Sequence, residues 1–152
     1  YARDLYPPPG WTLPFGQAAL CRRTPDNSAD ATVVTWGAMV QRSLDAADLL
    51  AADGIETEVL DLRTIIPWDR QAVADSVART GRLVVAHEDV GTAGFGAEIA
   101  AWVAGECFHL LRSPIARVTA LDTHVPYSPA LEEVVLPQTA DVVGAVRSLI
   151  EA

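Results

Sequence analysis

The sequence predicts an α/β fold, in which a mainly parallel sheet is covered by helices on both faces. Short stretches rich in β-branched residues alternate along the chain with segments of helical period, as in successive strand–helix–strand units. These stretches are apolar at almost every position, which is typical of strands buried on both faces. The chain has 152 residues, the length of one ordinary domain.

The first thirty residues differ from the rest. Proline at positions 7, 8, 9 and 14 excludes a helix, because proline lacks an amide donor and restricts the residue before it. We therefore expect residues 1–15 to form an extended arm. Residues 17–22 are a short apolar stretch that predicts a weak edge strand, and the polar residues 24–30 predict a turn.

The regular pattern begins with a predicted strand at residues 31–36, which is rich in valine and threonine. Residues 39–53 follow as an amphipathic helix, and Gly54 is placed to end that helix in the left-handed conformation. The residues that share the apolar face of this helix are Val40, Leu44, Ala47 and Ala51.

The second unit has a strand at residues 57–62 and a helix that Asp69 can cap and that runs through Arg79. Val73 and Val77 face inward in this helix, and Gly81 closes it.

The remaining elements follow the same order. We expect a strand at 83–87, a glycine-rich turn, a helix at about 96–108, a strand at 115–119 and a proline-containing loop at 122–137. A terminal helix is indicated by apolar residues spaced i, i+1, i+4, i+7 and i+8. These residues are Val142, Val143, Val146, Leu149 and Ile150.

The charge balance argues against a nucleic-acid or anionic-membrane surface. The formal net charge is −9 and the isoelectric point is near 4.6, whereas such surfaces need a basic face. An acidic surface favours a basic partner or serves solubility alone. All eleven positive residues are arginine, which excludes a Schiff-base or P-loop lysine in this chain. No apolar run reaches the roughly 18–20 residues that cross a membrane.

The cysteine, histidine and serine residues match no familiar catalytic or metal pattern. Cys21 and Cys107 lie 86 positions apart, which predicts buried thiols in a reducing compartment and leaves a disulfide open. His109 and His124 form no recognised zinc spacing with Cys107, so we expect no metal site. No serine lies in a G-x-S-x-G motif.

The arginine bias is typical of a GC-rich genome, and we expect a cytoplasmic bacterial protein.

A glycine-rich turn at residues 87–96 is the most suggestive segment, because it follows a strand and precedes a helix. One alternative for the chain is a free-standing α/β interaction or nucleotide-binding module, and in the nucleotide-binding case the helix amides would hold a phosphate. The glycine order is G-x-x-G-x-G, however, and the nearby carboxylates would repel a phosphate. The favoured interpretation is a tight turn that lets the helix approach the sheet closely. The glycines are Gly91, Gly94 and Gly96, and the carboxylates are those of Glu88, Asp89 and Glu98.

His87 and Glu88 at a strand end raise the question of a general base. Adjacent residues of a strand point to opposite faces, so the two side chains do not pair naturally. An interface or loop-anchoring role is favoured for His87.

Tyr127 and Leu131 in the 122–137 loop offer apolar anchors for a protein interface, and packing of that loop on its own sheet is equally open. Trp36, Trp68 and Trp102 are interpreted as packing residues.

Five segments, taken in order, resemble one family. The first three are VTWGAMV at 34–40, EVLDLRT at 58–64 with Pro67 and Asp69, and GRLVV at 81–85 leading to His87-Glu88. The last two are GFGAEI at 94–99 and Pro126-Tyr127. Together they resemble the C-terminal domain of the beta chain of thiamine-diphosphate-dependent 2-oxo acid dehydrogenases. Residues 1–16 are then the connector and 17–152 the transketolase C-terminal-like domain. Because the chain begins at Tyr1, we expect it to have been processed or cut from a longer one.

The resemblance implies a three-layer α/β/α sandwich with a five-stranded, mostly parallel sheet and one antiparallel edge strand, residues 17–22. It implies an oxidoreductase of two alpha and two beta chains that decarboxylates a 2-oxo acid, branched-chain first and pyruvate second. That enzyme uses thiamine diphosphate with magnesium and acylates a lipoyl group. The family's activating glutamate lies in another domain, so we expect no catalytic, cofactor or metal residue in this chain.

The resemblance assigns this domain to assembly. The implied partners are the alpha chain, a second beta chain and the basic subunit-binding domain of the lipoyl acyltransferase core. The isolated domain is expected to self-associate through surface left uncovered. Two positions depart from relatives: Ala93 replaces a second glycine, and Arg112 replaces an acidic residue. The candidate interface residues are His87, Glu88, Phe95, Glu98, Arg112, Asp122, Tyr127, Leu131 and Glu132.

Overall fold

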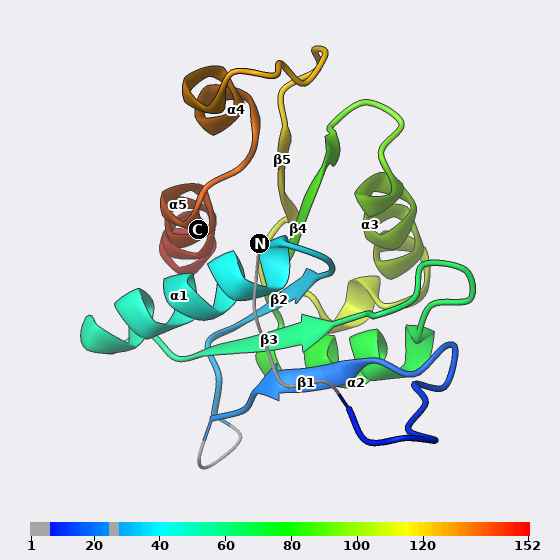
Figure 1. Cartoon of the computed structure of the whole chain (residues 1–152). Helices are drawn as coiled ribbons and strands as arrows, with labels where there is room; N and C mark the ends of the chain where they lie inside the picture. Colours follow the sequence, from blue (N-terminus) through cyan, green and yellow to red (C-terminus); the bar gives the residue numbers. More distant parts are fainter. Residues whose placement is uncertain (1–6, 25–27) are drawn as a thin grey trace.

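The computed structural model describes residues 7–24 and 28–152. A five-stranded sheet with the order β1-β3-β2-β4-β5 forms the middle layer, and only β1 at its edge is antiparallel (Figure 1). This arrangement confirms the predicted α/β class and the implied antiparallel edge strand. The strands are β1 (Ala19–Arg22), β2 (Ala31–Thr35), β3 (Thr57–Asp61), β4 (Leu83–Val90) and β5 (Ala116–Ala120).

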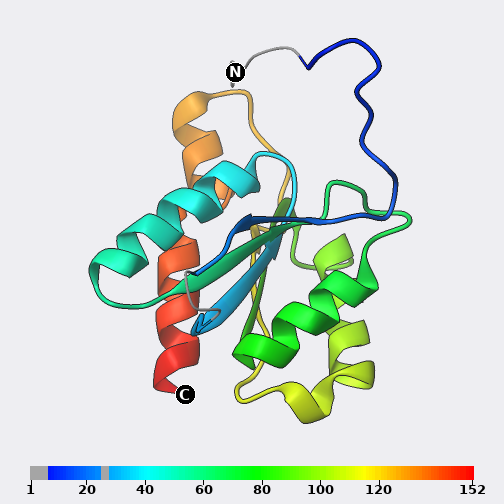
Figure 2. The ribbon, with the colours of Figure 1, turned by 90° about the horizontal axis from the view of Figure 1, so that it is seen from below.

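Two pairs of helices cover the sheet, one pair on each face (Figure 2). The helices α1 (Met39–Ala52) and α5 (Thr139–Glu151) pack on one face. The opposite face is covered by α2 (Arg70–Thr80) and α3 (Phe95–Glu106). A short 3-10 helix, η1 (Phe108–Leu110), follows α3.

The central strand explains the uninterrupted apolar pattern of the sequence. All five residues of β2 are buried, between β3 on one side and β4 on the other. Val33 lies in the core beneath α1 and α5, and its neighbour Val34 lies in the core beneath α2 and α3. Alternate residues of β2 therefore pack into two separate cores, so neither face of the strand is exposed to solvent.

The helix ends follow local chemistry, as predicted. Asp69 caps α2, because its Oδ1 accepts a hydrogen bond from the amide of Ala72 at 3.0 Å. Its Oδ2 accepts from the amide of Ala18 at 3.0 Å, so one carboxylate also holds the chain that enters β1. Gly54 follows α1 with φ +80°, and Gly81 ends α2 with φ +70°.

The segment before β1 is irregular and exposed from residue 7 to residue 15, as expected of an extended arm. At its end, the amide of Gly16 donates to Thr64 Oγ1 at 2.9 Å. Residues 1–6 of the expected arm and residues 25–27 of the expected turn lie outside the described residues.

Three expectations about local structure are wrong. The segment 122–137 is not loop throughout, because α4 (Pro129–Val135) lies in it; proline is tolerated in the first turn, where its missing amide has no partner to lose. Strand β4 extends past His87 to Val90, because it re-pairs with β5 at Ala120. Cys21 is exposed on the edge strand rather than buried, whereas Cys107 is buried, and both thiols are free.

Ala93 occupies a backbone conformation that favours glycine, with φ +60°. The left-handed region costs a residue with a Cβ about 1–2 kcal/mol, and glycine's extra freedom in the unfolded chain recovers roughly half of that. We expect Ala93→Gly to raise the free energy of unfolding by about 0.5–1 kcal/mol in urea titrations. An unchanged or lower value would contradict a left-handed Ala93, and Ala104→Gly, at an exposed helical position of α3, is the control expected to lose about 0.5–1 kcal/mol.

Candidate functional site

The end of β4 and the turn that follows it form a site around His87. The His87 side chain has no exposed surface, and its ring stacks on Trp36 with centroids 5.1 Å apart and planes 7° apart. Neither ring nitrogen has a hydrogen-bond partner among the described residues. A Cβ added to Gly96 would come closer than 3.0 Å to the His87 ring, and one added to Gly94 would overlap the Val90 carbonyl oxygen. His87 therefore packs tightly against Gly94 and Gly96, and the interface or loop-anchoring role remains a prediction.

Burial lowers the pKa of His87; Asp89 acts in the opposite direction and Arg117 adds to the lowering. The folded protein therefore holds the ring neutral, while the unfolded chain binds a proton near the ordinary pKa of about 6.5. His87 contributes stability above that pH, and the contribution is lost as the pH falls toward the depressed pKa of the folded state.

We expect the free energy of unfolding to fall between about pH 6.5 and 5.5 more steeply in the wild type than in His87→Leu. The difference in slope has an upper limit of about 1.4 kcal/mol per pH unit, which corresponds to one proton. Urea titrations across this range measure it. Equal slopes in the two proteins would show that the pKa of His87 is not lowered in the folded protein. His109→Leu, at an exposed position, is the control for replacing a histidine by leucine.

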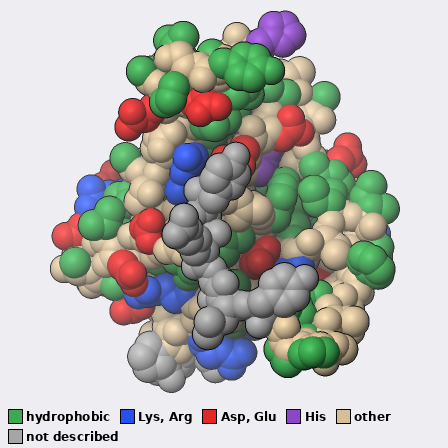
Figure 3. Space-filling model, viewed as in Figure 1, with side chains coloured by type: hydrophobic (Ala, Val, Ile, Leu, Met, Phe, Trp, Pro, Cys, Tyr) green, Lys and Arg blue, Asp and Glu red, His purple; other side chains and the backbone are tan. Residues whose placement is uncertain are grey.

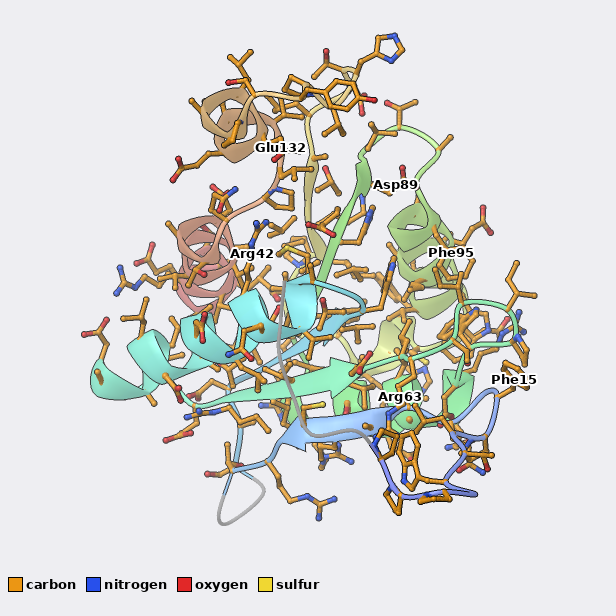
Figure 4. All side chains as sticks on the ribbon, in the orientation of Figure 1. Phe15, Arg42, Arg63, Asp89, Phe95 and Glu132 are labelled. Carbon is orange, nitrogen blue, oxygen red and sulfur yellow. The ribbon has the colours of Figure 1, made fainter. Side chains whose placement is uncertain are left out.

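Glu88 lies on the face of the sheet opposite to His87, as the alternation of strand side chains predicts. Its Oε1 is 3.9 Å from the guanidinium of Arg42 on α1, and Arg42 also donates to the carbonyl oxygen of Pro137. Figure 4 shows Arg42 on α1 and Glu132 on α4, and both residues line one small hollow. A His87–Glu88 general-base pair is therefore absent, because the two groups serve different layers.

The turn after β4 is fastened to the end of β5 by Asp122. Its carboxylate accepts from the amide and the hydroxyl of Thr92, and these hydrogen bonds are the main reason that the pKa of Asp122 is lowered. Arg117 donates to the Gly91 carbonyl at 2.8 Å. Side chains from β5 and the segment after it thus close the turn, which agrees with the tight-turn interpretation rather than with a phosphate site.

The residues that the structure describes offer no cation site of the usual kind. Within 7–24 and 28–152, no group of three or more His, Cys, Asp or Glu side chains is placed to hold a metal ion. In the same part of the chain, no helix is long and apolar enough to cross a membrane.

His87, a candidate interface residue, is fully buried in this structure and so offers no surface to a partner, and Glu88 lies beside Arg42; the other candidate interface residues fall into two groups. One lies at the carboxyl end of the sheet, over the β5–α4 connection, where hydrophobic side chains reach the surface in Figure 3. Tyr127 is fully exposed there, with Leu131 55% and Val134 70% exposed, while Glu132 is half-buried. The other group lies along α3 and just beyond it: Phe95 and Glu98 are on the helix, and Arg112 comes after η1.

Sequence reasoning missed most of the apolar residues that accompany this second group. Ile66 is 85% exposed and Phe108 is 72% exposed. Trp68 and Trp102, by contrast, were interpreted as packing residues, and they do pack edge to face at 5.2 Å, with the Arg70 guanidinium over both rings. Glu98 and Ala101 lie on a side of α3 turned away from the buried Ile99 and Val103, and this helical phase was the available signal for an outward face. Phe108 follows the helix, in η1, and gave no such signal.

The comparisons with known proteins agree with this architecture. The model of the transketolase C-terminal domain matches residues 22–142. A solved structure titled split gene transketolase, inactive beta4 tetramer, is 28% identical with a TM-score of 0.80, covering 95% of this chain and 45% of that one.

Three relatives match most of the chain. The acetoin:2,6-dichlorophenolindophenol oxidoreductase subunit beta of Cupriavidus necator is 40% identical over 93% of this chain and 40% of its own length. The 2-oxoisovalerate dehydrogenase subunit beta 2, mitochondrial, of Arabidopsis thaliana is 39% identical over 95% of this chain and 38% of its own. The pyruvate dehydrogenase E1 component subunit beta of Bacillus subtilis is 39% identical over 98% of this chain and 44% of its own.

The chain thus spans about two fifths of the length of these relatives. Its sheet order, its antiparallel edge strand and the match over 22–142 agree with one another. The chain belongs to the transketolase C-terminal domain family.

Proposed function

We propose that this chain is the C-terminal domain of the beta chain of a thiamine-diphosphate-dependent 2-oxo acid dehydrogenase, with residues 1–16 as its connector. The observation that carries the proposal is the similarity, over at least 93% of this chain, to three proteins named as beta subunits of oxidoreductases. The whole enzyme would decarboxylate a 2-oxo acid and transfer the acyl group to a lipoyl group. Relatives named for 2-oxoisovalerate and for pyruvate are equally similar, so a branched-chain 2-oxo acid or pyruvate is the proposed substrate.

The role proposed for this domain is assembly rather than chemistry. The described residues do not fit thiamine diphosphate with magnesium: the glycine turn is filled by His87, and its neighbours Asp89 and Glu98 would repel a diphosphate. No catalytic step is therefore assigned to this chain. The cofactor would be held by the alpha chain and by the remainder of the beta chain.

The proposed partners are the alpha chain, a second beta chain and the basic subunit-binding domain of a lipoyl acyltransferase core. A net charge of −9 supports a basic partner, because opposite fields speed the encounter and exclude like-charged competitors. The acidic candidates at the surface are Glu88, Glu98, Asp122 and Glu132, and Arg112 is the exception in sign. A bacterial cytoplasm is the proposed compartment. It is supported by the bacterial relatives and by the use of arginine alone, without lysine, for the positive residues.

A hybrid beta chain tests the proposal. The matching region of the Bacillus subtilis pyruvate dehydrogenase beta subunit is replaced by this chain, and the hybrid is produced together with the alpha subunit of that enzyme. We expect it to associate with alpha and to oxidise pyruvate with ferricyanide, thiamine diphosphate and magnesium within about tenfold of the parent rate. The parent with the region deleted is the control.

A hybrid that melts cooperatively but fails to bind the alpha subunit would overturn the proposal. Titration calorimetry of this chain with thiamine diphosphate and magnesium gives an independent check. We expect no binding heat, and saturable binding would place a cofactor site in this domain and contradict the assembly role.

A further inference from the structure

The turn between β4 and α3 covers a side chain that can carry a charge but has no hydrogen-bond partner. His87 has no exposed surface, and neither of its ring nitrogens is hydrogen-bonded among the described residues. Buried polar groups normally have a partner, because burial removes their hydration. A protonated imidazole has two N–H donors and no acceptor, so the closed structure offers no stable place for the charged form.

The surroundings of the His87 ring are mostly uncharged. Trp36, which follows β2, stacks on the ring, and Gly96 of α3 lies against it. Two charged groups act on the ring: Asp89 of β4 favours the protonated form, and Arg117 of β5 opposes it. Among the described residues, β2 and α3 contribute no charged group that acts on it. Burial is the largest influence, and it lowers the pKa of His87.

The turn is exposed at its tip and is held from the segment after β5. Residues 92–93 form the exposed tip, and Figure 4 marks the two ends of the turn by Asp89 on β4 and Phe95 on α3. The carboxylate of Asp122 holds the tip through the amide and the hydroxyl of Thr92. These hydrogen bonds lower the pKa of Asp122, so its carboxylate stays ionised at pH 5.5 and above. This fastening is therefore constant over the range in which a histidine titrates.

We propose that the turn at residues 91–94 is an acid-sensitive cover, which opens without unfolding of the domain and lets the His87 ring take up a proton from solvent. The cover is the short route to water, because the ring is bounded elsewhere by the sheet, by Trp36 and by the core beneath α3. Exposed turns with few buried contacts are the parts of a fold that open locally. Phe95 contacts Trp36 edge to face at 6.0 Å, so opening displaces this candidate interface residue as well. The cover needs no cofactor and no partner, and it does not depend on the proposed function.

Proton linkage sets the direction and the size of the effect. In the open form the ring titrates near its ordinary pKa of about 6.5, whereas the closed form takes up a proton only at lower pH. The open form therefore binds more protons, and acid favours it. The ratio of open to closed forms rises by up to about tenfold between pH 7.5 and pH 5.5.

Amide hydrogen exchange of this chain, measured by NMR and corrected for the intrinsic pH dependence of exchange, tests the proposal. The amides of Thr92 and Ala97 report on the cover, because they donate to Asp122 and to the Gly94 carbonyl; the amide of Thr32 in the central strand reports on the whole domain. We expect the protection factors of the first two to fall about five- to tenfold from pH 7.5 to pH 5.5. They should lie well below that of Thr32 and should not change in dilute urea, as is typical of local opening.

Two variants separate the ring from its cover. In His87→Leu the pH dependence of these protection factors should disappear, whereas the exposed control His109→Leu should keep it. Thr92→Val removes one hydrogen bond from the cover, so opening should increase about two- to tenfold at both pH values while the pH dependence persists. Thr123→Val, at a neighbouring exposed threonine, is the matched control and should change the protection factors by less than about twofold.

An NMR titration of the His87 ring in the wild type needs no substitution, and we expect an apparent pKa below about 6.5. A ring that titrates at or above this value would overturn the proposal. So would protection factors of Thr92 and Ala97 that equal that of Thr32 or do not change with pH, or a pH dependence that persists in His87→Leu. These readouts require no catalysis and no alpha subunit, so they are independent of the hybrid-enzyme assay.

Discussion

Replacing Arg79 by methionine is expected to lower the free energy of unfolding by about 3–5 kcal/mol. The reason is Glu58, a carboxylate in β3 with no exposed surface. Arg79 Nε and Nη2 donate to the two carboxylate oxygens of Glu58 at 3.0 and 2.9 Å. Methionine keeps most of the apolar stem of arginine but leaves a buried charge without a partner, and urea titration at neutral pH measures the loss.

Two further variants isolate the ion pair. Arg147→Met is the matched control, because Arg147 pairs with Asp53 at the surface, where both side chains are about half exposed; we expect a loss of no more than about 1 kcal/mol. Adding Glu58→Leu to Arg79→Met should recover much of the stability, since no charge then remains buried. A loss in Arg79→Met no larger than in Arg147→Met would show that water or another group solvates the Glu58 carboxylate.

This ion pair could not be predicted from the sequence. Glu58 interrupts an apolar strand, and its partner lies 21 positions later on α2. Local pattern gives the strand and the helix, but the pairing depends on how α2 crosses the sheet. The buried hydroxyls of Thr32 and Thr80, 2.9 Å apart, depend on the same crossing.

Features fixed by neighbouring residues were predicted well. Asp69 caps α2 and Gly54 and Gly81 follow their helices as expected, because caps and left-handed turns depend on a few adjacent residues. The alternation of strand side chains also separated His87 from Glu88 correctly. Helix α4 was missed because its prolines suggested a loop, although Pro129 lies where a helix accepts proline.

The candidate site was only partly predictable for the same reason. The sequence places charged and aromatic residues near the carboxyl ends of the strands, but exposure depends on distant packing. His87 is fully buried beneath the α3 turn, while Ile66 in the β3–α2 connection and Phe108 in η1, which carry no chemical signal, are largely exposed. Exposure of an apolar residue becomes visible only after the layers have been assembled.

Gly96→Ala is expected to destabilise the domain by about 2–3 kcal/mol. The added methyl group would overlap Nε2 and Cδ2 of His87, and Val85 lies 3.2 Å away. The His87 ring is held by its stack on Trp36 and cannot move aside without opening the core. Alanine is otherwise the better helix former, so the expected loss measures the overlap. Thermal and urea unfolding give the value.

Gly144→Ala in α5 is the control, because a Cβ there meets nothing within 4 Å; we expect a gain of about 0.5–1 kcal/mol from helix propensity. The cause of the Gly96 effect is isolated in a double-mutant cycle with His87→Ala, in which the loss caused by Gly96→Ala should shrink by at least about 1 kcal/mol. An undiminished loss would mean that the α3 turn needs glycine for another reason. A diminished loss would show that the small residue at 96 and the imidazole at 87 are one packing unit.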